Sequence, residues 1–297
     1  MNDRTNVLVT GADGFIGRHL VPYLASLGFM VIAASRKASA YKHANIVTVR
    51  LPDISAAFDW DPLLQECDAV VHLAGIAHKF ANDALYERVN YRATEALANA
   101  VFLRGKHLVF ISSIAAQSGA SSDHELTEDG LPSPTNGYGR SKLAAEQSIR
   151  ATGVSFTILR PVVIYGSGEK GNFAMIHNLA RFPIPLPFGA LTAKRSILSI
   201  ENFNSAVATV LVNSRARGET FIVSDPAPLT VAEIILQYRT NLGRSALLLP
   251  IPERWIELAF KAIGRNETWQ RIGQPLVAPP TKLLALGWEP VVLNNPL

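Results

Sequence analysis

Two side chains four residues apart have the chemistry to move a proton together. Tyr138 and Lys142 begin a helical pattern over residues 138–151, and their i, i+4 spacing puts both side chains on one helix face. A phenol has an unperturbed pKa of about 10, so alone it exchanges protons poorly at neutral pH. An ammonium about 4 Å away contributes roughly 4 kcal/mol at an effective dielectric constant of about 20, or about three pKa units. The pair therefore indicates an acid–base function, although the same spacing also occurs on ordinary surface helices.

Two hydroxyl groups precede this pair in the chain. Ser112 and Ser113 stand at the end of the apolar run that begins at residue 108. Because the carboxyl ends of parallel strands face the ligand crevice, we expect one of these hydroxyls to hold a carbonyl oxygen beside Tyr138.

A glycine-rich turn has the spacing of a phosphate-binding motif. Gly11, Gly14 and Gly17 stand where the apolar run 6–10 gives way to the helical pattern 16–27. The first glycine permits a tight turn, the second lets a pyrophosphate approach the backbone, and the third lets the helix pack on the strand. The N-terminus of the helix then offers amide groups and a partial positive charge to the phosphates. In this context the spacing predicts a dinucleotide site.

The residues after the second strand bear on which dinucleotide binds. An acidic residue there would accept a hydrogen bond from the ribose 2′-hydroxyl of NAD, whereas this chain has Ser35, Arg36 and Lys37. A hydroxyl and two cations suit a 2′-phosphate, so NADP is favoured over NAD. The alternative is a solvated basic turn.

Six short apolar runs alternate with helical patterns over the first 160 residues. The runs lie at 6–10, 30–34, 46–50, 69–73, 108–112 and 156–160, and the clearest helical patterns lie at 16–27, 86–103 and 138–151. Strands that are apolar on both faces are typical of a parallel sheet covered by helices on either side. The sequence therefore predicts a doubly wound α/β fold of the Rossmann type.

The pattern changes after residue 160, where prolines crowd a short region. Two strand-like runs at 196–200 and 220–224 bracket a helical pattern at 201–213. We expect residues 1–160 to form a dinucleotide-binding domain, with 196–224 returning to it. Residues 161–195 and 225–297 are expected to form a smaller, mixed α/β substrate lobe.

Composition excludes several classes of protein. Of the 297 residues, 48% are hydrophobic and 18% are charged, which does not suit a disordered chain. The net charge is +4, but the basic residues are scattered, so we expect no nucleic-acid partner. The single cysteine, Cys67, excludes an intramolecular disulfide, and the seven histidines have no metal-binding spacing. With no apolar stretch of about 18 residues and no long apolar signal core, we expect a cytoplasmic protein with no metal and no membrane partner.

Six motifs together resemble those of the extended short-chain dehydrogenases/reductases. They are GADGFIG at 11–17, HLAG at 72–75, VNYRAT at 89–94, FISS at 110–113, YGRSK at 138–142 and LRPVVIYG at 159–166. The chain is similar, more narrowly, to the sugar-nucleotide branch of the epimerase/dehydratase family that contains UDP-glucose 4-epimerase. The resemblance covers nearly the whole chain.

The resemblance implies a role for each matching residue. Tyr138 would be the acid–base, Lys142 its activator and a ribose ligand, and Ser113 the hydroxyl that polarises the sugar carbonyl, with Ser112 as its neighbour. The other residues that it implies for cofactor binding are Gly11, Asp13, Gly14, Phe15, Ile16, Gly17, Ser35, Arg36, Lys37, Asp53, Ile54, Leu73, Ala74, Gly75, Asn90, Ser112 and Pro161.

Substrate residues also follow from the resemblance. Asn172 and Arg195 match residues that meet the diphosphate of a UDP-sugar; Arg271 is a second candidate, and His78 lies near the crevice. Arginine suits this task because its planar fork binds two phosphate oxygens. The nucleotide-sugar 4,6-dehydratases carry an Asp-Glu pair after the strand-five hydroxyl, where this chain has Ile114 and Ala115. Neither side chain can move a proton, so dehydration of that kind is not expected.

Two reactions remain open for this site. A 4-ketoreductase makes one hydride transfer and exchanges its cofactor, which suits the NADP-type residues, and the segment 185–203 looks most like reductases that make UDP-N-acetylquinovosamine. A 4-epimerase instead keeps a tightly bound NAD. A third reading is a non-catalytic NADP(H) sensor, which the presence of both Tyr138 and Lys142 disfavours.

Two of the predicted helices bear on assembly. The patterns at 86–103 and 138–151 carry apolar residues beyond one core-facing stripe, including Leu97, Val101, Leu143 and Ile149. In related proteins these helices pair with their copies in a four-helix bundle. The resemblance therefore predicts a two-fold homodimer.

Overall fold

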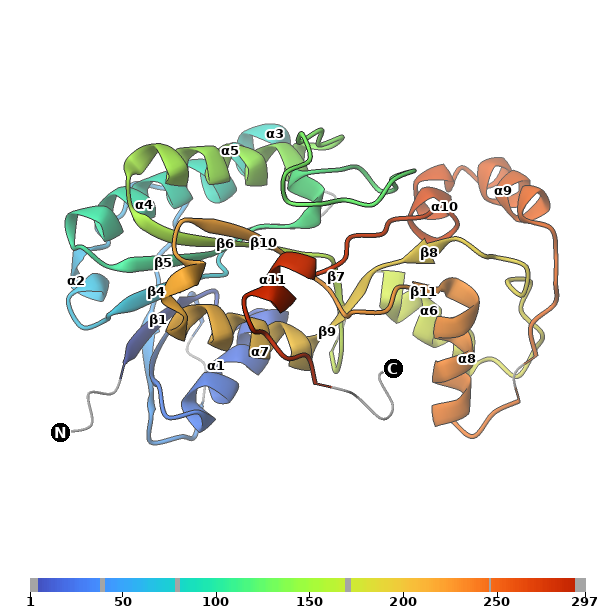
Figure 1. Ribbon diagram of the computed structural model, residues 1–297, viewed down its shortest axis with the longest axis horizontal. Coiled ribbons are helices and arrows are strands. Elements are labelled where there is room, and N and C mark those ends of the chain that lie inside the picture. Colours follow the sequence, from blue (N-terminus) through green and yellow to red (C-terminus); the bar gives the residue numbers. More distant parts are fainter. Residues whose placement is uncertain (1–4, 38–40, 78–80, 169–171, 246, 292–297) are drawn as a thin grey trace.

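A large parallel sheet forms one side of the molecule and a smaller lobe the other (Figure 1). The computed structural model describes residues 5–37, 41–77, 81–168, 172–245 and 247–291. The sheet has seven strands in the order β10-β6-β5-β4-β1-β2-β3, and every neighbouring pair is parallel. The strands are β1 (Asn6–Thr10), β2 (Met30–Ser35), β3 (Ile46–Arg50), β4 (Ala69–His72), β5 (His107–Ile111), β6 (Ser155–Pro161) and β10 (Glu219–Val223).

Helices cover both faces of this sheet, as the apolar strands require. One face packs against α1 (Phe15–Ser26), α7 (Ile200–Val212) and α11 (Thr281–Ala285). The opposite face packs against α2 (Asp61–Leu64), α4 (Ala93–Leu103) and α5 (Gly137–Thr152). The predicted doubly wound fold is confirmed.

The smaller lobe has a hydrophobic core of its own. That core is formed mainly by α6 (Asn172–Arg181), α8 (Val231–Asn241), α9 (Glu253–Ala262) and α10 (Asn266–Ile272). Two short sheets belong to this part of the fold: β7 (Val163–Tyr165) pairs with β9 (Ile197–Ser199) in parallel, and β8 (Lys194–Arg195) pairs with β11 (Leu229–Thr230) in antiparallel.

The predicted return of 196–224 to the large sheet holds only in part. β10 joins the sheet and α7 covers one face, but β9 pairs with β7 outside it. A later segment also returns: Leu276, Leu283 and Trp288 are buried in the core of the large sheet, although the sequence assigned 225–297 to the substrate lobe. Apolar side chains alone did not indicate which of the two cores they would join.

The helical pattern predicted over 86–103 is divided in the structure. α3 (Asp83–Tyr86) leads into a π-helical turn, η1 (Glu87–Arg92), before α4 begins. Two short 3₁₀ turns, η2 (Ile114–Ala116) and η3 (Ser214–Ala216), complete the described elements. Such π-turns are common at functional sites, and this one holds Asn90.

The apolar residues named for a dimer interface mostly face inward. Leu97, Val101 and Ile149 are fully buried in this chain's own core, and Leu143 is partly exposed. The prediction that these four side chains are available for a dimer interface is therefore wrong for three of them. These three side chains pack in the core between the sheet and the two helices, and α4 and α5 also contact each other.

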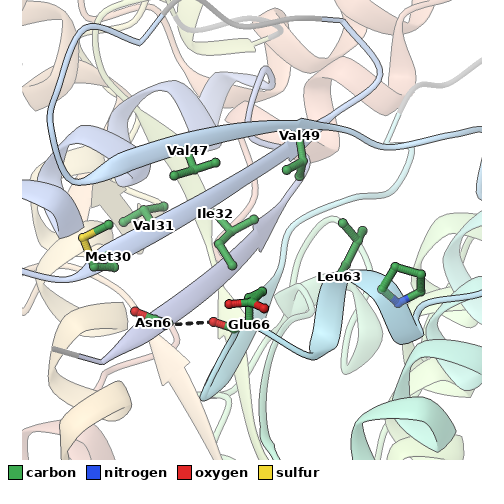
Figure 2. Close-up of a pocket in the computed structure, with 9 residues that line it drawn as sticks. Asn6, Met30, Val31, Ile32, Val47, Val49, Leu63 and Glu66 are labelled. Atoms are coloured by element: carbon green, nitrogen blue, oxygen red, sulfur yellow. Dashed lines mark hydrogen bonds between the residues drawn. The ribbon is translucent and has the colours of Figure 1, made fainter. Parts of the chain in front are cut away.

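The four-residue α2 leaves part of its sheet face uncovered. A hollow of about 300 Å³ remains there. Figure 2 shows its lining, in which Met30, Ile32, Val47 and Val49 lie on the strands and Leu63 on the opposite side. Asn6 closes its edge through a 2.9 Å hydrogen bond from Nδ2 to the Glu66 carbonyl, drawn as a dashed line. Within the described residues no helix is long and apolar enough to cross a membrane.

Candidate active site

The glycine turn between β1 and α1 is packed too tightly for larger side chains. Gly11 has φ 72°, and a Cβ there would lie 2.9 Å from the backbone nitrogen of Ala74. A Cβ on Gly17 would lie 2.4 Å from the carbonyl oxygen of Gly11. Gly14 is the N-cap of α1 and has no side chain to cover the first amides of the helix. The turn therefore has the geometry that a pyrophosphate site needs.

Tyr41 completes this turn, and the sequence analysis missed it. Its hydroxyl donates a 2.6 Å hydrogen bond to the Ala12 carbonyl and contacts the Gly17 carbonyl at 3.5 Å. Burial, followed by the charge of Asp13, raises the pKa of Tyr41, so the phenol stays protonated and able to donate. Its segment has no motif that would have predicted a place beside Gly11–Gly17.

Ser35, Arg36 and Lys37, which were predicted to favour NADP over NAD, lie at the end of β2 and directly after it. Ser35 is buried and donates a 2.5 Å hydrogen bond to the Lys37 carbonyl, whereas Arg36 and Lys37 are exposed. Asp53 lies nearby: its pKa is lowered first by hydrogen bonds from Ser55 and then by the charges of Arg36 and Arg88. Arg88, on η1, was not predicted and adds a third cation to this edge of the sheet.

A directed chain of hydrogen bonds fixes the turn after β4. The Ala74 amide donates to Thr10 Oγ1 at 3.2 Å, and Thr10 bonds His72 Nδ1 at 2.8 Å. His72 Nε2 lies 3.1 Å from Thr94 Oγ1, which donates to the Asn90 carbonyl at 2.8 Å. Burial, followed by the charge of Lys142, lowers the pKa of His72 to about 3. A neutral histidine with its proton on Nε2 satisfies every step of this chain.

Asn90 extends the chain toward α5. Its side chain accepts from the Ile76 amide at 2.8 Å and donates to the Ile76 carbonyl at 2.9 Å and to Ser141 Oγ at 3.1 Å. Ser141 in turn donates to the Tyr138 carbonyl at 2.8 Å. The structure thus ties Leu73, Ala74 and Gly75, predicted to run under the cofactor, to the helix that carries Tyr138.

Ser113 and Tyr138 are brought together across η2 and α5. The Ser113 hydroxyl lies close enough to the Tyr138 phenol to lower its pKa, and Ser113 is also the N-cap of η2, accepting from the Ala115 amide at 3.2 Å. Gly139 permits the approach, because a Cβ there would overlap the Ala115 carbonyl. Asn136 caps α5 by accepting from the Gly139 amide at 2.8 Å. These two groups have the chemistry to bind a carbonyl oxygen and to give it a proton.

The expected lowering of the Tyr138 pKa by Lys142 is wrong for this structure. Burial raises the pKa of Tyr138 to about 12, against a smaller lowering by Ser113. The Lys142 ammonium donates to the Ile111 carbonyl at 2.8 Å and lies 4.7 Å from the centre of the Phe110 ring. Burial also lowers the pKa of Lys142, to about 8, opposed by Glu146. Burial therefore sets the direction of both shifts, and the ion–phenol attraction that the sequence argument considered alone is not among their causes.

A buried ionic network lies beneath these groups. The Glu146 carboxylate accepts from Arg160 Nε at 3.0 Å and Nη2 at 2.6 Å, and also from the Ser112 hydroxyl. Arg160 donates a further 3.0 Å bond to Gln117, whose amide reaches the Thr127 carbonyl. Glu146 is 1% exposed and Arg160 is 4% exposed, so this is a satisfied pair in the interior. Ser112 serves this network, which leaves Ser113 as the hydroxyl that meets Tyr138.

Arg195 and Arg271 line one cavity of about 190 Å³, which also reaches Ile114 beside Ser113. Arg195 donates to the carbonyls of Ala120 and Gln274, and burial followed by the charge of Arg271 lowers its pKa to about 10. Arg271 is more open, with 35% of its side chain exposed and Glu267 3.9 Å away. Two cations in one cavity suit a diphosphate, and Arg271 has more donors left to offer it.

The remaining predicted residues are placed as follows. Ile54 is buried next to Asp53, and Pro161 closes β6. Asn172 begins α6, but its side chain lies outside the described part of the chain, as does His78 altogether. Among the described residues, no group of three or more histidine, cysteine or acidic side chains could hold a metal ion.

The family follows from a comparison with known proteins. Residues 7–224 match the model of the NAD dependent epimerase/dehydratase family. The chain belongs to this family. As a member of it, the chain is an NAD(P)-dependent enzyme. The match spans the glycine turn, Ser113, the Tyr138–Lys142 pair and Arg195.

Curated relatives of this epimerase/dehydratase include both reaction types. The chain is 30% identical to a UDP-glucose 4-epimerase of Vibrio cholerae, over 96% of this chain and 90% of that protein. It is 28% identical to a 2'-dehydrokanamycin reductase of Streptomyces kanamyceticus, over 85% and 71% respectively. The fold matches a UDP-glucuronic acid 4-epimerase from Bacillus cereus in complex with NAD, with a TM-score of 0.78 and 22% identity, over 98% of this chain and 95% of that one.

Proposed function

We propose that this epimerase/dehydratase reduces the C4 keto group of a UDP-sugar with NADPH. The observation that carries the proposal is the proximity of the Ser113 hydroxyl to the Tyr138 phenol, within the fold that also presents the glycine turn and the cavity of Arg195 and Arg271. Both hydroxyls can reach one carbonyl oxygen, and the two arginines can hold the diphosphate of the same sugar nucleotide.

The chain's own residues supply the proton half of the reaction. When bound, the reduced nicotinamide supplies the hydride that adds to C4. Tyr138 gives its hydroxyl proton to the sugar O4 while Ser113 donates a hydrogen bond to the same oxygen. The raised pKa of Tyr138, about 12, keeps the phenol protonated at neutral pH. Lys142, on the same face of α5, is proposed to hold the nicotinamide ribose.

Residues at the end of β2 support NADPH as the cofactor. Arg36 and Lys37 are exposed where a 2′-phosphate would lie, and Ser35 stands in place of the carboxylate that would repel it. Arg88 adds positive charge near Asp53.

A second candidate is a UDP-glucose or UDP-N-acetylglucosamine 4-epimerase that retains NAD. The observation in its favour is the 30% identity to the Vibrio cholerae UDP-glucose 4-epimerase over nearly the whole chain. An epimerase oxidises C4 and returns the hydride to the other face, so it consumes no external cofactor.

One assay separates the two reactions. The purified protein is mixed with NADPH and the 4-keto-6-deoxy form of UDP-N-acetylglucosamine, and absorbance at about 340 nm is followed with mass spectrometry of the sugar. A reductase oxidises one NADPH for each sugar that gains two hydrogens. Interconversion of UDP-glucose and UDP-galactose without added cofactor supports the epimerase instead.

We also propose a two-fold homodimer, which the resemblance implies. The end of α4 offers Leu103, which is 81% exposed, and Phe102, which is 49% exposed. Light scattering after size exclusion at micromolar concentration tests this, and a monomeric mass would contradict it.

A further inference from the structure

The short segment that carries Ser113 is anchored on both sides by buried side chains. Ser113 itself is partly exposed, whereas Ser112 before it and Gln117 after η2 are each 3% exposed. η2 lies between these two anchors, and its amides at Ala115 and Ala116 bond back to the hydroxyl and the carbonyl of Ser113. The position of the Ser113 hydroxyl therefore depends on what holds Ser112 and Gln117.

One carboxylate on α5 holds both anchors through two arms. In the first arm, Glu146 Oε1 accepts directly from the Ser112 hydroxyl. The second arm runs through Arg160, which donates to Glu146 from Nε at 3.0 Å and from Nη2 at 2.6 Å. Its Nη1 then donates to Gln117 Oε1 at 3.0 Å. Both arms start from the helix that carries Tyr138, so the carboxylate links the positions of the two hydroxyls.

The far end of the second arm is fixed to the main chain around it. Gln117 Nε2 donates to the Thr127 carbonyl, and the Gln117 carbonyl accepts from the Ser133 amide at 2.8 Å. Gly130 packs against the same side chain, because a Cβ there would lie 2.8 Å from Gln117 Nε2. Gln117 therefore cannot shift without the loss of several contacts.

Two further contacts hold the end of β5 to α5. Gly139 brings the first turn of the helix against Ala115, because a Cβ there would overlap the Ala115 carbonyl. One turn later, the Lys142 ammonium donates to the Ile111 carbonyl at 2.8 Å. The chain on either side of Ser113 is thus held to a single helix.

We propose that Glu146 is a positioning residue that sets the Ser113 hydroxyl against the Tyr138 phenol. Glu146 is 1% exposed, so it reaches no ligand and acts only through its two arms. A buried polar network whose members are hydrogen-bonded rigidifies its surroundings and specifies one arrangement, which apolar packing of the same volume does less strictly. The inference rests on the proposed function, because it needs Ser113 to bind the reacting oxygen, but it applies to the reductase and the 4-epimerase alike.

The two arms can be cut one at a time without unpairing the buried charges. Ser112→Ala removes the first arm and Gln117→Met removes the second, whereas a change at the carboxylate itself would leave a buried arginine unpaired and endanger the fold. Thr157→Val is the matched control. Thr157 is 0% exposed on β6 and donates to the Ala216 carbonyl at 2.7 Å, so this variant loses a buried hydrogen bond outside the network. Melting temperatures establish that all three variants are folded.

Hydrogen exchange followed by mass spectrometry tests the positioning without a substrate. In the full-length protein, the amides of residues 115, 116 and 117 donate to Ser113 Oγ, the Ser113 carbonyl and the Ile114 carbonyl. Both arm variants should speed exchange in peptides that cover 113–117 by about fivefold or more, the effect expected of one lost hydrogen bond. Thr157→Val should leave these peptides unchanged. Wild-type exchange at 113–117 in both arm variants would overturn the proposal.

A double-mutant cycle then shows whether the network acts through Ser113. Turnover is measured with NADPH and the 4-keto-6-deoxy form of UDP-N-acetylglucosamine, and separately with UDP-glucose. Gln117→Met should lower kcat by roughly tenfold or more with little change in KM, because a misplaced hydroxyl loses its bond to the reacting oxygen. In a Ser113→Ala background the same change should lower kcat by less than about twofold, since the group that it positions is gone.

The outcomes separate this inference from the proposed function. A further tenfold loss from Gln117→Met in the Ser113→Ala background, or an equal loss of kcat in Thr157→Val, would overturn the positioning role alone. Unchanged turnover in Ser113→Ala would overturn both, because it removes Ser113 from the reaction. If neither substrate is turned over, the proposed function fails, and the exchange at 113–117 alone supports or overturns the positioning.

Discussion

Two buried arginines show how differently the two halves of this enzyme are held together. Arg160, in the sheet half, is paired with the Glu146 carboxylate and leads through Gln117 to the loop after Ser113. Arg239, in the substrate lobe, is equally buried but donates to the main-chain carbonyls of Phe182, Ile184 and Leu247. In the sheet half, side chains thus hold other side chains beneath Ser113 and Tyr138. In the lobe, one side chain holds the main chain of two loops.

The largest expected effect is on the free energy of unfolding and concerns the sheet half. Arg160→Met leaves the Glu146 carboxylate buried without its partner, which should lower the free energy of unfolding by about 3–5 kcal/mol. The matched change in the lobe is Lys261→Met, which breaks a pair whose cation is half exposed and should cost less than about 1 kcal/mol. Urea denaturation of both variants measures the difference. If both variants lose the same free energy of unfolding, the buried network is not what stabilises the sheet half.

The proton transfer is the next largest effect. Tyr138→Phe keeps the ring and removes the transferable proton, so turnover should fall by about 10²-fold or more while cofactor binding changes little. Tyr23→Phe, on α1, removes a phenol elsewhere in the same half and should keep wild-type turnover. A Tyr138→Phe variant with unchanged turnover would remove the phenol from the mechanism.

Substrate affinity should depend on the lobe. Arg271→Met removes charge-assisted hydrogen bonds worth about 1.5–3 kcal/mol, so KM for the UDP-sugar should rise about tenfold or more. The Kd of the cofactor should not change, because the glycine turn lies in the other half. Arg217→Met, another exposed cation, serves as the control. A parallel loss of cofactor affinity would contradict this division of tasks.

The smallest effect concerns cofactor choice within the sheet half. Ser35→Asp combined with Arg36→Ala replaces a hydroxyl and a cation by a carboxylate, which repels a 2′-phosphate and accepts from a 2′-hydroxyl. The ratio of Kd for NADH to Kd for NADPH should fall by roughly tenfold or more. Fluorescence titration of both nucleotides measures it, and an unchanged ratio would place the 2′-phosphate elsewhere.

The same contrast explains what the sequence could predict. The sheet was predictable because buried parallel strands are apolar on both faces, and the glycine turn because close packing demands its spacing. Glu146 was not singled out, although Tyr138, Lys142 and Glu146 follow one another at four-residue steps. The Tyr138 pKa was misjudged because a pairwise charge argument leaves out burial, which only the folded chain determines.

The sequence predicted less about the substrate lobe than about the sheet. Arg195 and Arg271 were selected by resemblance, and the structure brings them to one cavity, but their hydrogen bonds to carbonyls could not be foreseen. The segment from Leu276 to Trp288 has ordinary apolar spacing that fits either core. These features follow from packing between distant segments and not from local pattern.

The central claim is that this enzyme is a reductase that uses a releasable NADPH. Its most direct test is the pair of dissociation constants of the wild-type protein for NADPH and NADH, measured after the purified protein has been checked for retained nucleotide. Charge-assisted hydrogen bonds from Arg36 and Lys37 to the 2′-phosphate should make NADPH bind roughly tenfold or more tightly than NADH. Tighter binding of NADH, or NAD carried through purification, would contradict the reductase and leave the 4-epimerase as the better account.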